Sequence, residues 1–172
     1  PYTSIDSEKG DIRLLELQPG RFQDVLDIRL VASNLLHGAE QAYEALSYVW
    51  GTSICPQKAI LNGIPVTITE NLDCALRHLR LKLTTRTLWI DALSMNQADI
   101  QERNHQVQIM GKIYSTAVGV IVWLGPVNEK DLHLKAASIE TPRSVPSEAI
   151  HRLIARPWFC RAWVVQELAL SK

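Results

Sequence analysis

The sequence predicts an α/β fold with a mainly parallel sheet and helices on both faces. Three short apolar runs indicate the parallel strands, and each ends on or just before a residue suited to meet a ligand; they span residues 45–51, 87–91 and 120–125. Residues 118–124 are so uniformly apolar that both faces of that strand are expected to be covered, as in a central parallel strand. Parallel strands bring their carboxyl ends to one edge of the sheet, where open sheets bind ligands. The residues expected at this edge are Trp50, Gly51, Asp91 and Gly125.

Further extended segments accompany these runs. Residues 12–17 alternate apolar and polar side chains and stop at Pro19-Gly20, which predicts a strand closed by a turn, and residues 25–30 predict a second strand. The Asn62-Gly63 pair lies between β-branched residues and readily adopts the positive φ angles of a type I′ turn, so it predicts a β-hairpin over residues 58–68. We expect this hairpin to be added to the parallel sheet.

Helices are predicted between and after the strands. The first covers residues 71–82, with one apolar face made of Leu72, Leu76, Leu79 and Leu83. Asp99 is expected to cap a single long helix, with Glu102 bonding back to the cap. The inward side chains of this helix are expected to be Ile100, Val107, Met110, Ile113 or Tyr114, and Ala117. With a strand over residues 86–91 before it and the apolar strand after it, it forms a right-handed crossover.

The C-terminal quarter has a weaker pattern. Residues 126–146 contain prolines and charges without clear periodicity, which is typical of a variable loop. Ser147 is expected to begin a helix, Pro157 to interrupt it, and helical spacing resumes over residues 161–170.

Composition narrows the function classes. The 172 residues fit one domain, and the 18 basic residues balance the 18 acidic ones, so no basic face for nucleic acid is expected. The arginines over residues 77–86 are interpreted as the solvated end of a helix. The three widely spaced cysteines predict reduced thiols and a cytoplasmic protein, with Cys160 buried and inert. No run approaches the roughly 18 apolar residues of a membrane span. We expect the chain to be a fragment of a longer protein.

Two constellations carry candidate chemistry. Trp163 and Glu167 lie four residues apart and so share a helix face, where an indole would shield a carboxylate from water; an ordinary structural ion pair is the plainer interpretation. Asp91 ends a strand and is followed by Asn96 and Gln97, whose amides, with the carboxylate, are suited to ribose hydroxyls or a carbonyl. Asp91 and Asn96 are equally suited to capping and bracing the loop.

Several common sites are absent from the sequence. Neither GxGxxG nor GxxxxGK[ST] occurs, which excludes the usual phosphate-binding loops, and the five histidines are scattered without metal-ligand spacing. We therefore expect no metal and no bound cofactor. A hydrolase with Cys160 as its nucleophile is a weaker third possibility.

Three ordered blocks of the sequence resemble the fungal heterokaryon incompatibility (HET) domain. They are YEALSYVWG (43–51), LWIDALSMNQADIQERNHQVQIMGKIYSTAVGVIVWLG (88–125) and RPWFCRAWVVQELAL (156–170). On this resemblance we expect residues 1–172 to form a single HET domain. Where the family commonly has a cysteine followed by isoleucine, this chain has Ser94-Met95. HET domains are distantly similar to TIR domains, which implies a flavodoxin-like sheet and, in several TIR branches, cleavage of NAD.

The resemblance implies roles for the candidate residues. The catalytic glutamate of such TIR domains lies in a Trp-Cys-x-x-Glu helix, and Trp163 and Glu167 keep that spacing with Val164 at the cysteine position, so Glu167 is the expected catalytic residue. The expected substrate-binding residues are Trp50, Gly51, Asp91, Asn96, Gln97, Arg161 and Trp163. The implied function is NAD cleavage in fungal cell death, with NAD as substrate, a homo-oligomer, and further domains or NLR-type partners in the full-length protein. The alternative is a non-catalytic module that triggers death by oligomerising and recruiting partners.

Overall fold

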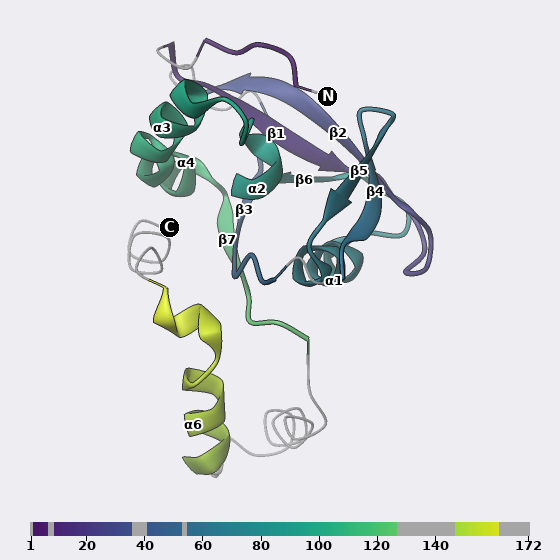
Figure 1. Ribbon diagram of the computed structural model, residues 1–172, viewed down its shortest axis with the longest axis vertical. Helices are drawn as coiled ribbons and strands as arrows, with labels where there is room; N and C mark the ends of the chain where they lie inside the picture. Colours follow the sequence, from purple (N-terminus) through teal and green to yellow (C-terminus); the bar gives the residue numbers. More distant parts are fainter. Residues whose placement is uncertain (1, 7–8, 36–40, 53–54, 127–146, 162–172) are drawn as a thin grey trace.

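The computed structural model describes residues 2–6, 9–35, 41–52, 55–126 and 147–161, which adopt an α/β fold (Figure 1). In this part of the chain seven strands form one sheet: β1 (Asp11–Leu17), β2 (Leu26–Asn34), β3 (Glu44–Tyr48), β4 (Gln57–Leu61), β5 (Ile64–Ile68), β6 (Arg86–Trp89) and β7 (Gly119–Trp123). The helices are α1 (Glu70–Leu79), α2 (Asp91–Ser94), α3 (Ile100–Gln108), α4 (Met110–Thr116), α6 (Ser147–Ile154) and the short 3-10 helix η3 (Pro157–Cys160).

The sheet is mixed rather than mainly parallel, so that prediction was wrong. The strand order is β5-β4-β2-β1-β6-β3-β7. Strand β3 pairs in parallel with both β6 and β7, as the three apolar runs predict. Strand β1, however, lies in the middle of the sheet and runs antiparallel to both β2 and β6. Strand β7 is at the end of the order, so the prediction of a central strand was also wrong.

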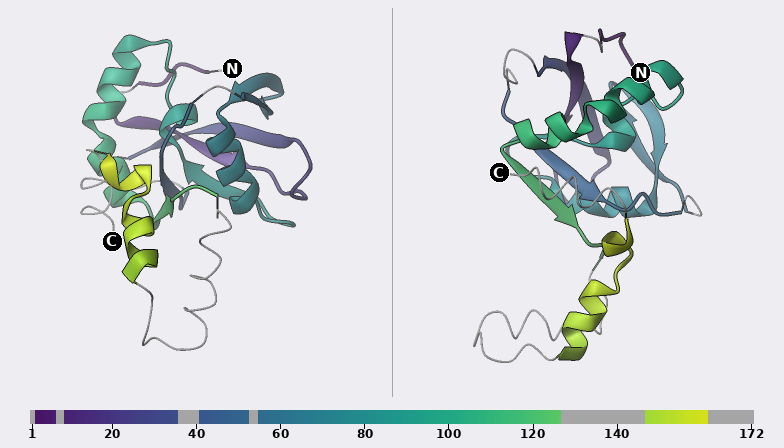
Figure 2. Two further views of the ribbon diagram at one scale, coloured as in Figure 1. Left: turned by 60° about the horizontal axis from the view of Figure 1, so that its bottom comes forward. Right: turned by 90° about the vertical axis from the view of Figure 1, so that its left-hand side faces the viewer.

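Each face of the sheet carries a buried core. Side chains alternate along each strand, so that in β1 Leu15 belongs to one core and Leu14 to the other. The first core packs against α1 through Leu72 and Leu76, and the second packs against α4 through Ile113. Figure 2 shows α3 and α4 lying across one face of the sheet. Helices on both faces were predicted, and this is confirmed.

The hairpin prediction is confirmed. Strands β4 and β5 pair antiparallel with Leu61 opposite Ile64, and the two turn residues, Asn62 and Gly63, have φ angles of 51° and 77°. Positive φ at both central positions is the signature of a type I′ turn. The hairpin joins the sheet through β4, which runs parallel to β2.

Helix α1 is shorter than predicted. Its cap is Thr69, whose hydroxyl accepts a hydrogen bond from the backbone N–H of Leu72, and it ends at Leu79 because Arg80 has extended backbone angles. Leu83 is 90% exposed, so its expected place on the buried face was wrong. The interpretation of the nearby arginines as a solvated helix end was also wrong. Arg80 is buried and donates to the carbonyls of Arg21, Asp24 and Val25, which fixes the turn after β1.

The predicted long helix is two helices. Ile109, with φ −92° and ψ 3°, separates α3 from α4. Asp99 caps α3 as predicted and accepts hydrogen bonds from the backbone N–H groups of Gln101 and Glu102. Ile100 is 63% exposed rather than inward, because the apolar contact with the sheet is made by α4.

The last described residues dock on the ends of β3 and β7. The Trp158 indole donates to the Ser47 hydroxyl at 2.7 Å, and the Arg156 guanidinium donates to the Leu124 carbonyl at 2.8 Å. The predicted helix from Ser147 is confirmed as α6, which extends away from the sheet beyond the end of β7 (Figures 1 and 2). Cys160 is exposed, so its expected burial was wrong. Among the described helices, none combines the length and the apolar character needed to cross a membrane.

Candidate functional site

The parallel strands bring Trp50 and Asp91 together, as predicted for residues at their carboxyl ends. The Trp50 indole N–H donates to one carboxylate oxygen of Asp91 at 2.8 Å. The other oxygen accepts from the backbone N–H of Ala92 at 2.7 Å, at the start of α2. These two bonds hold the Asp91 carboxylate in place at the strand ends.

A cavity of about 170 Å³ opens beside this pair. Its lining residues come from the strand ends, the loop between α2 and α3, the helices α3 and α4, and the segment after η3; they are Trp50, Asp91, Met95, Gln97, Arg103, Val107, Met110 and Arg161. Four of these, Trp50, Asp91, Gln97 and Arg161, were predicted from the sequence as ligand-binding residues. The apolar floor of the cavity, made of Met95, Val107 and Met110, and Arg103 were not predicted. Helical spacing gave a signal for Arg103, because it lies four residues before Val107 on the same face of α3.

The loop between α2 and α3 shapes one wall of the cavity. The Gln97 amide donates to the Asp91 carbonyl at 2.9 Å, which fixes its side chain beside the strand end. Asn96 is not brought to the cavity. Its backbone N–H donates to Glu102 at 2.7 Å, and its side chain accepts from the backbone of Ala98, so it braces the loop. The bracing interpretation of Asn96 is the one its contacts support.

Gly51 lines a second cavity, of about 360 Å³, and does not line the cavity beside Trp50. Its φ of +76° is strained for any residue with a side chain, and an added Cβ would lie 3.3 Å from Asn71. Asn71 clamps the strand ends here, because it donates to the Val49 carbonyl at 2.6 Å and accepts from the Trp123 indole at 3.0 Å. Gly51 therefore allows the chain to pass close to this clamp.

Tyr48, at the end of β3, is influenced by a negative charge on Asp91 and a positive charge on Arg161. Burial raises the pKa of Tyr48 well above its usual value, the Asp91 charge raises it further, and the Arg161 charge lowers it. Tyr48, the last residue of β3, therefore stays protonated. Arg161 reaches this position because η3 is anchored to β3 by the hydrogen bond between Trp158 and Ser47.

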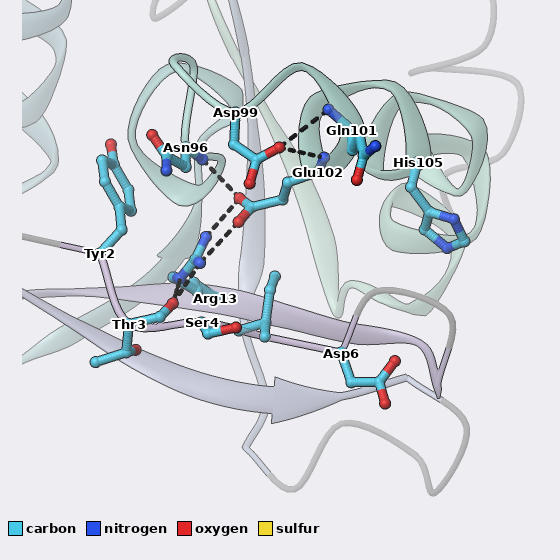
Figure 3. Close-up of a pocket in the computed structure, with 11 residues that line it drawn as sticks. Tyr2, Thr3, Ser4, Asp6, Arg13, Asn96, Asp99, Gln101, Glu102 and His105 are labelled. Atoms are coloured by element: carbon cyan, nitrogen blue, oxygen red, sulfur yellow. Dashed lines mark hydrogen bonds and ion pairs between the residues drawn. The ribbon is translucent and has the colours of Figure 1, made fainter.

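A larger and more polar hollow, of about 950 Å³, lies between the N-terminal segment, β1 and α3 (Figure 3). Its central group is the buried Arg13 guanidinium, which makes a bidentate ion pair with Glu102 at 2.6 and 2.9 Å. The same guanidinium donates to the carbonyls of Thr3 and Ser94. These polar groups satisfy one another, so the hollow is better explained as a structural joint than as a ligand site. The predicted bond from Glu102 back to the Asp99 cap was wrong, because Arg13 engages this carboxylate.

The predicted catalytic Glu167 and the stacking candidate Trp163 lie outside the described residues. The expectation that Glu167 faces the strand-end site stays a prediction. Cys160 is a free, exposed thiol, and the cysteine–histidine contact recorded in the structure joins Cys74 and His78 at 3.8 Å. Within the described ranges no three histidine, cysteine or acidic side chains gather as a metal-binding group.

Two comparisons with known proteins indicate the same family. The family model described as heterokaryon incompatibility protein (HET) matches residues 43–167. The heterokaryon incompatibility protein 6, OR allele, of Neurospora crassa is 30% identical over an alignment 225 residues long, which covers 97% of this chain and 33% of the relative. The chain thus spans about a third of the length of the curated relative it matches. No solved structure matches the chain.

Proposed function

Because this chain belongs to the heterokaryon incompatibility (HET) domain family, we propose that it is a cell-death effector domain of fungal allorecognition that cleaves NAD in the cytoplasm, in a TIR-like manner. The kinship with TIR domains is part of the proposal. It is supported by the parallel strands β6, β3 and β7, with ligand-facing residues at their carboxyl ends, as in flavodoxin-like sheets. The antiparallel β1 departs from that pattern.

The proposed reaction breaks the bond between nicotinamide and ribose. Water adds to the ribose carbon, nicotinamide leaves with the bonding electrons, and the products are nicotinamide, ADP-ribose and a proton. The transition state resembles an oxocarbenium ion, so a fixed carboxylate stabilises it electrostatically. Glu167 would supply that carboxylate, Trp50 would stack on a ring, and Asp91 would accept from a ribose hydroxyl. Arg161 would contact a phosphate oxygen.

One observation carries this proposal. The hydrogen-bonded pair of Trp50 and Asp91 lies at the strand ends, beside a cavity with an apolar floor and two arginines in its lining. An aromatic ring, a ribose hydroxyl and a phosphate each find a suited group there.

The test is release of nicotinamide from NAD, measured by chromatography. Wild-type protein is expected to release it, and Glu167→Ala to lose at least about a hundredfold in rate, the usual scale for a group that stabilises transition-state charge. Glu16→Ala, on β1, is the matched control because Glu16 does not line the cavity, and it should keep the wild-type rate. If Glu167→Ala releases nicotinamide at the wild-type rate, Glu167 has no part in the mechanism. If no nicotinamide is released at any protein concentration, the proposal that the domain cleaves NAD is refuted.

The second candidate is a non-catalytic module that signals by self-association and partner recruitment, including NLR-type partners and domains beyond this chain. Two features favour it. Strand β7 is an edge strand of the described sheet, and α6 exposes Ile150 and Ile154, which are 44% and 54% accessible and lie four residues apart. Exposed sheet edges and paired apolar side chains on a helix are common association surfaces.

Self-association and catalysis are separable by one measurement series. Ile154→Lys is expected to weaken association in analytical ultracentrifugation without unfolding the chain, because its side chain is more than half exposed. If the variant blocks cell death while no protein preparation releases nicotinamide, the module is non-catalytic. If nicotinamide release rises steeply with protein concentration and falls in Ile154→Lys, the enzyme requires assembly.

A further inference from the structure

The cavity beside Trp50 has the volume of one small ring. An apolar cavity of roughly 150 Å³ in a protein core is enough to bind benzene. The cavity here is about 170 Å³ and has an apolar floor of Met95, Val107 and Met110. Its volume therefore matches a single six-membered ring better than a fused purine, although the cavity is open to solvent on one side.

Arg103 is placed to contact an anion at this cavity. It is exposed on α3, and within the described part of the chain its guanidinium has no recorded ion pair or hydrogen bond. The two acidic residues nearest to it along α3 are engaged elsewhere. Asp99 caps the helix, and Glu102 pairs with Arg13 on the other side. An unpaired arginine at the edge of an apolar cavity is suited to bidentate binding of a phosphate group.

We propose that this cavity selects a mononucleotide unit with one six-membered ring, and that Arg103 holds its phosphate. The inference rests on the proposed function and narrows it, because it assigns the nicotinamide half of NAD, rather than the adenine half, to the cavity. In this arrangement the ring contacts Met110 and Trp50, and the ribose lies by Asp91. The 5′-phosphate reaches Arg103, and the remainder of a dinucleotide extends into solvent.

Calorimetric titration tests the assignment on the whole chain carrying Glu167→Gln, which removes the proposed turnover and leaves the described lining unchanged. The probes are nicotinamide mononucleotide, nicotinamide riboside, UMP and AMP. Nicotinamide mononucleotide is expected to bind at least about tenfold more tightly than the riboside, because only the mononucleotide has a phosphate that can form a charge-assisted hydrogen bond with Arg103. AMP is expected to bind at least about tenfold more weakly than nicotinamide mononucleotide, because the cavity volume matches a single ring better than a fused purine.

Adding Arg103→Gln should abolish the advantage of the mononucleotide over the riboside and leave riboside affinity unchanged. Arg29→Gln is the matched control, because Arg29 is an exposed arginine on β2 and lines none of the described cavities. If Arg103→Gln leaves the ratio of the affinities for nicotinamide mononucleotide and nicotinamide riboside unchanged, the assignment of Arg103 is overturned. AMP binding as tightly as nicotinamide mononucleotide, or no saturable binding of any probe, would overturn the ring-size selection.

The outcomes separate this inference from the proposed function. Ring-selective and phosphate-dependent binding without nicotinamide release from NAD would support the cavity assignment and refute the enzyme. Nicotinamide release with an unchanged ratio in Arg103→Gln would support the enzyme and refute the role of Arg103. UMP binding equal to that of nicotinamide mononucleotide would support selection by ring size and point to a pyrimidine nucleotide as an equal ligand.

Discussion

Replacing Glu102 by glutamine removes the charge that balances a buried arginine. In the folded chain Glu102 accepts two hydrogen bonds from Arg13 and a third, at 2.7 Å, from the backbone N–H of Asn96 (Figure 3). The Arg13 and Glu102 side chains are only 2% and 10% exposed, so little water can replace the lost carboxylate. Glu102→Gln keeps an acceptor for Asn96 and leaves the guanidinium without a counter-ion.

The expected loss is about 3 kcal/mol in the free energy of unfolding. Breaking a buried ion pair by removing one partner costs about 3–5 kcal/mol, and the lower end applies because Arg13 keeps its bonds to the Thr3 and Ser94 carbonyls. For a chain of this size each kcal/mol lowers the melting temperature by about 2–4 °C, so a decrease of about 6–12 °C is expected.

Urea unfolding followed by circular dichroism measures the change. The double variant with Arg13→Met should be less destabilised than the sum of the single variants, with a coupling of at least about 1 kcal/mol. Lys9→Gln, which breaks an exposed ion pair with Asp6, is the control and should unfold with the wild type. The interpretation of the pair as a structural joint would be refuted if Glu102→Gln lowered the free energy of unfolding by less than about 1 kcal/mol, or if the effects of the two single variants were additive.

The same pair predicts a pH dependence. Burial acts to raise the pKa of Glu102, but the hydrogen bonds from Arg13 and from the Asn96 N–H outweigh it and hold the pKa below its ordinary value. Because the folded pKa is depressed, this stabilisation is present above the unfolded pKa of about 4.3 and is lost as the pH falls through the folded pKa. The stability difference between wild type and Glu102→Gln should therefore shrink in acid. A difference that is constant down to the acid unfolding transition would contradict this assignment.

Three further variants test other parts of the structure. Asn71→Leu should lower stability by about 1–3 kcal/mol in urea unfolding, because it leaves the Val49 carbonyl and the Trp123 indole N–H without their partner; a loss under about 0.5 kcal/mol would show that the clamp is dispensable. Gly63→Ala should cost about 1–2 kcal/mol through its φ of +77° alone, since nothing lies within 4 Å of an added Cβ; no loss would argue against the type I′ turn. Cys160→Ser should keep the wild-type rate of nicotinamide release, and loss of that rate would favour the thiol nucleophile.

Local signals in the sequence predicted local structure well. The Asn62-Gly63 turn and the Asp99 cap depend on residues within a few positions of one another, and both are present as expected. The shared edge of Trp50 and Asp91 also followed from the sequence, because strand polarity alone brings the carboxyl ends of parallel strands together.

Features that depend on distant neighbours were missed. Nothing within β1 indicates that it lies between β2 and β6 and runs antiparallel to both, since pairing partners are chosen by the whole sheet. Arg13 did carry a signal, because an arginine inside an otherwise apolar strand is expensive to bury unless it is paired. Its partner lies 89 residues further along the chain, a separation that periodicity does not reach.

The two rims of the described sheet differ in their capacity to add another strand. On β5, Pro65 faces Ile60 in the non-hydrogen-bonded position next to the turn, so it removes a donor that would otherwise point outward. Strand β7, at the other rim, contains no proline. Self-association of the proposed module through β7 would leave only the blunted β5 rim as the outer edge of the described sheet. Rim-to-rim growth would therefore stop at a closed twofold pair instead of continuing into a fibril.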